Sequence, residues 1–132
     1  MLRLYMLNKL CWPTLMLITL VACSEATNTA MDQVIDADIK NMSGKLPLKV
    51  SEGMAITSME RKGREVIYTY SFLSNDIQPG KFDTKLAQEA GKSQLCKTQQ
   101  TMEMMEDGYV FVYRYKYQNG QVETLNFSKK DC

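Results

Sequence analysis

The residue types that carry most enzyme chemistry are scarce in this sequence. Its 132 residues include four cysteines and no histidine. Without histidine, the chain can form neither a Ser-His-Asp triad nor a Cys-His pair, and it lacks the most common side-chain ligand for transition metals. The cysteines are too scattered for a zinc site, and no glycine-rich phosphate-binding loop follows a predicted strand. This pattern predicts a protein that is not an enzyme and that uses no cofactor or metal.

Two other groups of side chains could still do chemistry. Glu103, Glu106 and Asp107 offer carboxylates for acid–base work, although sequence neighbours of this kind are typical of a solvated face. The segment Met102-Glu103-Met104-Met105 offers thioethers, which can bind Cu(I). The same methionines could line an adaptable peptide-binding surface or pack in the core. The pattern favours packing and leaves the other two interpretations open.

The first 22 residues have the composition of an export signal. Arg3 and Lys9 are the only charged residues before an apolar run from Leu10 to Ala22. A basic start followed by a short apolar stretch is typical of a secretory signal peptide. The run is too short to span a bilayer comfortably as a helix, which takes about 20 apolar residues. We therefore expect residues 1–22 to be removed on export.

The end of that signal, Leu20-Val21-Ala22-Cys23, resembles the lipobox of bacterial lipoproteins. The resemblance implies cleavage before Cys23 and a lipid on its sulfur, so that the protein is anchored to a membrane. Ser24 rather than aspartate follows Cys23, which resembles the outer-membrane sorting signal of enteric bacteria and implies the periplasmic face of the outer membrane. An ordinary signal with an incidental Cys23 and a retained membrane anchor are the alternatives.

Two cysteines remain for the exported domain. Cys11 belongs to the signal and Cys23 to the lipid site, which leaves Cys96 and Cys132. In the oxidising compartment that an export signal implies, such a pair normally forms a disulfide. Closing this loop would stabilise the fold by about 3–4 kcal/mol in the chain-entropy model. Free redox-active thiols are the alternative, which the lack of a Cys-x-x-Cys spacing disfavours.

The exported chain carries almost no net charge. Of 16 basic residues two belong to the signal, and the remaining 14 face 15 acids, for a net charge of −1. No global electrostatic field would draw in nucleic acid, so none is expected as a partner. Arg61, Lys62 and Arg64 form a local basic turn, which is either solvated or turned toward lipid headgroups.

The first half of the domain reads as a helix followed by a hairpin. Residues 23–30 are small and polar and predict a flexible tether. A helix is expected from Met31 to Ser43, where Gly44 ends it, and Leu46-Pro47 begins an extended segment. Residues 53–59 and 66–72 are rich in strand-forming residues and flank a polar turn, which predicts a β-hairpin.

The second half repeats that order. Asp83 is a plausible N-cap for a helix that reaches Leu95, although Gly91 weakens it, and residues 97–106 are ambiguous. A strand from Tyr109 is followed by a return strand at 121–127, with a type I′ turn expected at Asn119-Gly120. The fold class is therefore α+β, as a single domain over 31–132 in the order helix–hairpin–helix–hairpin. We expect an antiparallel β-sheet packed with two helices and held by one disulfide.

One face of the strand after Gly108 is entirely aromatic. Alternate positions along it carry Tyr109, Phe111, Tyr113, Tyr115 and Tyr117. Five aromatic side chains exceed what one helix easily covers, so we expect most to be core and one end to stay open. An open aromatic edge would suit a partner helix or peptide, which makes these five residues the candidate partner-binding site.

The order of these features resembles a known family. The lipobox, a helix and Leu46-Pro47 are followed by a Gly53-led hairpin, Leu95-Cys96, Gly108-Tyr109 and a terminal Asp131-Cys132. This order is similar to that of the small α/β pilotin lipoproteins of type II secretion systems, found in vibrios and pathogenic Escherichia coli. The methionine-rich segment and the dense tyrosine strand depart from it. Many uncharacterised envelope lipoproteins share the Leu-Pro, Tyr-x-Tyr and Asp-Cys pattern.

That resemblance implies a non-enzymatic binding and escort function. A pilotin binds a C-terminal helix of the secretin subunit, and its lipid lets the lipoprotein sorting machinery carry both to the outer membrane. A structural or stress lipoprotein of the envelope, or an inhibitor or exclusion lipoprotein, is the alternative.

Overall fold

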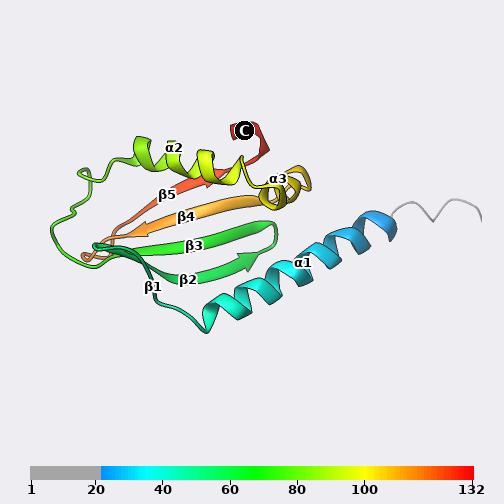
Figure 1. The fold of residues 1–132 in the computed structure, drawn as a ribbon, viewed down its shortest axis with the longest axis horizontal. Helices are drawn as coiled ribbons and strands as arrows, with labels where there is room; N and C mark the ends of the chain where they lie inside the picture. The colour runs from blue at the N-terminus through cyan, green and yellow to red at the C-terminus, as the bar shows by residue number, and fades with distance from the viewer. Residues whose placement is uncertain (1–21) are drawn as a thin grey trace, which may run out of the picture.

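The computed structural model describes residues 22–132, so the predicted signal, except for its last residue, lies outside the described part (Figure 1). The α+β class and both predicted hairpins are confirmed, and the described residues add a third helix and a fifth strand. Within the described residues, no helix is both long and apolar enough to cross a membrane. The elements in chain order are α1 (Ala22–Ser43), β1 (Leu48–Ser51), β2 (Met54–Lys62), β3 (Glu65–Phe72), α2 (Thr84–Leu95), α3 (Gln99–Glu106), β4 (Val110–Lys116), β5 (Val122–Phe127) and a final 3-10 turn, η1 (Lys129–Asp131).

The sheet is mixed, not wholly antiparallel as predicted. Its strands lie in the order β1-β2-β3-β4-β5, and β3 runs parallel to β4 while every other neighbouring pair is antiparallel. The chain between β3 and β4 crosses the sheet through α2 and α3, so β4 starts at the same end as β3 (Figure 1). Parallel neighbours require a long crossover of this kind. The crossover sets Tyr68 beside Tyr113 and Tyr70 beside Tyr115.

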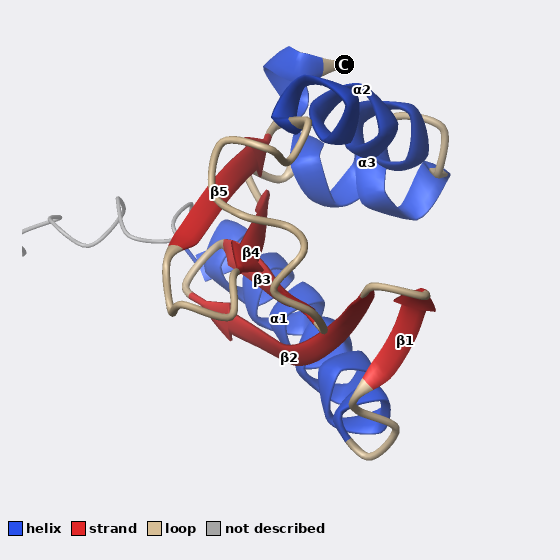
Figure 2. Cartoon of the chain, turned by 90° about the vertical axis from the view of Figure 1, so that its left-hand side faces the viewer, coloured by secondary structure: helices blue, strands red, loops and turns tan. Residues whose placement is uncertain are grey.

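All three helices contribute to one core on the aromatic face of the sheet. Ile35 of α1, Leu95 of α2 and the pair Met104 and Met105 of α3 are buried together with the side chains of the β4 aromatic face. The ambiguous segment 97–106 is therefore largely helix α3, whose methionines pack in the core. Figure 2 shows α2 and α3 over the β4–β5 side of the sheet and α1 along the β2–β3 side.

None of the described helices covers the opposite face of the sheet, yet this face carries a fully buried residue. Ile67 of β3 is 0 % exposed. Glu60 on β2 is its register partner, and Arg114 on β4 pairs with the next residue on the same face, Thr69. The Arg114 Nη1 and Glu60 Oε1 atoms are 3.7 Å apart, so this ion pair reaches across β3. Glu60 and Arg114 therefore share with Ile67 the face that no described helix covers.

Helix α1 begins earlier than the sequence predicted. It starts at Ala22 rather than Met31, so residues 23–30 are helical where an irregular tether was expected. Neither glycine nor proline occurs between Ala22 and Ser43, so no residue forces a break.

Arg61 ties α1 to the sheet. Its guanidinium donates two hydrogen bonds of 2.7 Å to the carboxylate oxygens of Asp36, and its Nη1 lies 3.3 Å from Asp32 Oδ1. The Arg61 side chain is only 17 % exposed. In the same basic turn, Arg64 donates to the carbonyl of Asp107. Lys62 forms an ion pair of 3.2 Å with Glu60, so all three predicted basic residues engage the domain's own groups.

Helix α2 begins and ends as its sequence predicts. The Asp83 carboxylate accepts a hydrogen bond of 2.9 Å from the Leu86 N–H, as an N-cap does. At the other end, Cys96 forms the expected disulfide with Cys132, with 5.5 Å between their Cα atoms. The disulfide joins the end of α2 to the C-terminal residue.

The turn between β4 and β5 differs from the predicted type I′ geometry. The Gly120 N–H donates to the Tyr117 carbonyl (3.0 Å), and the Tyr117 N–H donates to the Gln121 carbonyl (2.9 Å). The turn is therefore a three-residue loop that runs from Gln118 to Gly120. Such a loop needs positive φ at its last position, which Gly120 supplies with φ 87°.

Candidate functional site

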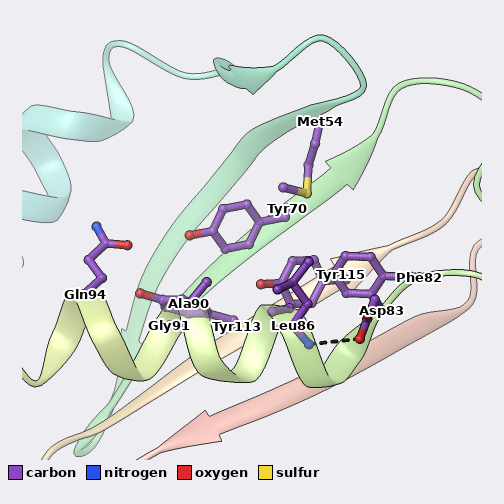
Figure 3. A pocket seen from close by; sticks show the side chains of 11 residues that line it. Met54, Tyr70, Phe82, Asp83, Leu86, Ala90, Gly91, Gln94, Tyr113 and Tyr115 are labelled. Atoms are coloured by element: carbon purple, nitrogen blue, oxygen red, sulfur yellow. Dashed lines mark hydrogen bonds between the residues drawn. The ribbon is translucent and has the colours of Figure 1, made fainter.

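A groove of about 420 Å³ runs beside α2, over the middle of the aromatic face (Figure 3). One wall comes from α2 and the floor from neighbouring strands β2, β3 and β4. The residues that line it are Met54, Tyr70, Phe82, Asp83, Leu86, Ala87, Ala90, Gly91, Gln94, Tyr113 and Tyr115.

The helical wall is built from small residues with one large apolar residue at its rim. Ala87, Ala90 and Gly91 recur at helical spacing and face the groove. Their small size leaves the space that forms the groove. Leu86 stands at the rim and is 66 % exposed, although it is a large apolar side chain.

Stacked aromatic rings form the floor. The rings of Tyr70 and Tyr115 stack at 17° with centroids 5.1 Å apart, because the parallel register places these two residues side by side. Phe82, which precedes α2, lies 4.6 Å from Tyr115 between ring centroids. These contacts fix the floor as a rigid aromatic surface.

The groove presents almost no charge. Asp83 is the one carboxylate that lines it, and that carboxylate already caps α2. Burial raises the pKa of Tyr70, Tyr113 and Tyr115 above the ordinary value of 10. The tyrosine hydroxyls are therefore neutral at physiological pH, and the groove suits an apolar or neutral polar occupant.

The five aromatic residues predicted as a partner site are all buried, with at most 7 % of any one exposed. Only Tyr113 and Tyr115 line the groove. Tyr109 and Tyr117 donate hydrogen bonds to Asp32 and Glu123, and burial followed by these bonds raises the pKa of each to about 12. The opening thus lies over the middle of the strand, whereas the sequence predicted it at one end.

Sequence reasoning missed the more accessible side of this site. Met54, Tyr70 and Leu86 come from three different elements, and none was singled out as a candidate. Tyr68 and Tyr70 alternate on β3 as the aromatic residues do on β4, which was the available signal. This alternation indicates a shared site only when β3 and β4 are known to be neighbours in the sheet.

The other candidates from the sequence do not converge on a reactive centre. Met104 and Met105 are 6 % and 2 % exposed, which supports packing over copper binding or peptide contact. Glu106 forms an ion pair of 2.7 Å with Lys129. No cluster of three or more potential metal-binding residues of the His, Cys, Asp and Glu types occurs in the part of the chain that the structure describes. Cys23 lies in the first turn of α1, and its lipidation stays a prediction.

Comparisons with known proteins identify the fold. No family model and no curated protein matches the sequence. A secreted protein of Pseudomonas aeruginosa matches with a TM-score of 0.67 at 13% identity, over 80% of this chain and 95% of its own. The pilotin EpsS of the Vibrio vulnificus type 2 secretion system matches with a TM-score of 0.65 at 11% identity, over 82% and 96%.

A second pilotin gives the same result. AspS of the Vibrio cholerae type II secretion system matches with a TM-score of 0.62 at 18% identity, over 83% of this chain and 99% of its own. At these identities the likeness concerns the fold. The predicted resemblance is thereby confirmed in structure: this chain has the fold of the small α+β pilotins of type II secretion systems.

Proposed function

We propose that this protein is a periplasmic lipoprotein of the outer membrane that binds and escorts a protein client without acting on it as an enzyme, as a pilotin does. The observation that carries the proposal is the aromatic groove beside α2, on a fold shared with two pilotins. The client is a secretin, bound through its C-terminal helix.

The lining of the groove supports a helical client. An amphipathic helix binds by placing its apolar face in an apolar groove. Here Leu86 and Met54 offer apolar surface at the mouth, and stacked rings offer it at the floor. A rigid aromatic floor gives large contact area at little cost in conformational entropy.

The escort step requires a membrane anchor, which belongs at the N-terminal end of α1, away from the sheet. Cleavage before Cys23 makes this cysteine the first residue of the exported chain. Lipid on its sulfur and amine would then attach directly to α1, which leads through Ser43 to the sheet. The client bound in the groove is carried wherever the lipoprotein is sorted.

An in-cell crosslink tests the proposal. The full-length lipoprotein, tagged after Cys132, is crosslinked in cells that express a secretin, then purified from membranes for mass spectrometry of its partners. We expect the secretin as a main partner of the wild type and its loss with Leu86→Asp. Because Leu86 is 66 % exposed, the fold should tolerate this substitution.

A matched control separates groove binding from a general surface effect. Val34→Asp introduces the same charge at a helical residue that is 50 % exposed and does not line the groove. This variant should capture the secretin like the wild type. A secretin that is present in the cells and absent from the wild-type crosslinks would reject the escort function. Equal capture by Leu86→Asp would reject the groove as its site.

A further inference from the structure

The groove has one polar end and one apolar end. In Figure 3 the hydroxyl of Tyr70 points toward Gln94, while Met54, Phe82 and Leu86 gather at the other end. Leu86 and Gln94 are eight residues apart on α2, so about two helical turns, or roughly 12 Å, separate the two ends.

The polar end contains two tyrosine hydroxyls. The rings of Tyr70 and Tyr113 are neighbours in the lining of the groove, with centroids 5.4 Å apart. Each hydroxyl can donate one hydrogen bond and accept two, so even a bond between the two would leave one donor and several lone pairs at the groove floor. The Gln94 side chain adds an amide donor and acceptor at the same end.

These groups are complementary to an uncharged side chain that both donates and accepts hydrogen bonds. A carboxylate or ammonium placed on this floor would lose its hydration without an opposite charge to pair with, which is costly. A methyl group placed there would leave the hydroxyls without a partner once water is excluded, which also costs binding energy. A primary amide of asparagine or glutamine satisfies both conditions.

We propose that the Tyr70–Tyr113–Gln94 end of the groove recognises one asparagine or glutamine on the otherwise apolar face of the client helix. Large apolar residues of that helix, about two turns away, fill the end formed by Leu86, Phe82 and Met54. The amide fixes the register of the helix in the groove. This inference rests on the proposed function, because it takes an amphipathic helix as the occupant.

Synthetic helical peptides test this recognition directly. Three peptides share one amphipathic sequence with leucine on the apolar face and differ at one central apolar-face position, which carries Asn, Leu or Asp. Each is titrated into the full-length lipoprotein in detergent by isothermal calorimetry. We expect the Asn peptide to bind about tenfold more tightly than the Leu peptide, and the Asp peptide to bind most weakly.

Removing the hydroxyls should reverse that preference. The double variant Tyr70→Phe/Tyr113→Phe should bind the Leu peptide more tightly than the Asn peptide, because its floor can no longer pair the amide. Tyr68→Phe is the matched control, since Tyr68 stacks edge-on against Tyr113 without lining the groove. It should keep the wild-type preference, and thermal unfolding should show that all variants are folded.

The outcomes separate this inference from the function on which it rests. If the Leu peptide binds the wild type as tightly as the Asn peptide, or if the double variant keeps the wild-type preference, amide recognition is wrong and helix binding stands. If none of the three peptides binds at millimolar concentration, the groove does not take amphipathic helices, so both amide recognition and the groove as the client site are wrong.

Discussion

Gly91 on α2 lies directly against the ring of Phe127 on β5. A Cβ atom at Gly91 would be 2.4 Å from Phe127 Cζ and 2.7 Å from Cε1, closer than real Cβ atoms approach other atoms. Phe127 is 1 % exposed and is itself packed against Tyr113, with ring centroids 5.0 Å apart. The glycine that weakened the helix prediction is what lets α2 approach the sheet this closely at Phe127.

We therefore expect Gly91→Ala to lower the free energy of unfolding by about 1–2 kcal/mol. Alanine favours a helix over glycine by about 1 kcal/mol, but overpacking a confined site costs more. Urea denaturation of the variant measures the difference. Gly44→Ala is the control, because the nearest atom to its new Cβ, the Asn41 carbonyl oxygen, is 3.8 Å away. A Gly91→Ala protein more stable than the wild type would contradict the close packing.

The disulfide should stabilise the end of α2. Cys132→Ser removes a link between residues 36 apart in sequence, which should lower the free energy of unfolding by about 3–4 kcal/mol in the chain-entropy model. The melting temperature should fall accordingly. A reducing agent should lower the melting temperature of the wild type by a similar amount and leave that of the variant unchanged. Equal melting temperatures for both proteins would mean that the bond contributes nothing to stability.

Local patterns in the sequence were enough to predict most elements. The strand-forming residues on either side of the polar turn Arg61-Lys62-Gly63-Arg64 predicted the β2–β3 hairpin, and Asp83 correctly marked the start of α2. These signals depend on residues close in sequence, whose periodicity reflects one local geometry. Helix α3 was left ambiguous because its eight residues include only three apolar side chains, Met102, Met104 and Met105, which are too few to establish a helical period.

The site could not be predicted because it depends on a non-local pairing. The sequence placed the aromatic residues of β4 on one face, but it did not show that β3 lies beside β4 in parallel. That register alone brings Tyr70 onto Tyr115 and Tyr68 onto Tyr113. A hairpin can be read from its turn, whereas pairing across a long crossover depends on how helices pack over the sheet.

The hydrogen-bonded ion pair between Arg61 and Asp36 predicts that the free energy of unfolding depends on pH. The hydrogen bond from Arg61 holds the pKa of the Asp36 carboxyl below its ordinary value of 3.8. A lowered pKa in the folded state stabilises the protein above the unfolded pKa, and this contribution disappears as the pH falls through the folded pKa. Asp36→Asn should therefore be less stable than the wild type at pH 7, and the difference should shrink below pH 3.8.

Chemical denaturation at pH 7 and pH 3 tests this dependence. Asp38→Asn is the matched control on the same helix, since no ion pair of Asp38 is found within residues 22–132. It should change stability less than Asp36→Asn at pH 7. A deficit of Asp36→Asn that is the same at both pH values would show that its charge does not hold α1 to Arg61.

The predicted lipid on Cys23 determines where the protein is found. With its native signal, the wild type should sediment with outer membranes, because two or more acyl chains anchor a protein stably. With residues 1–22 replaced by an ordinary cleavable signal, Cys23→Ser should appear in the soluble periplasm, because it lacks the predicted lipid that anchors the wild type. Cys11→Ser in the native signal is the control and should still be lipidated, which the intact mass of the purified protein measures. Recovery of the Cys23→Ser protein with the membranes would mean that another part of the chain attaches it there.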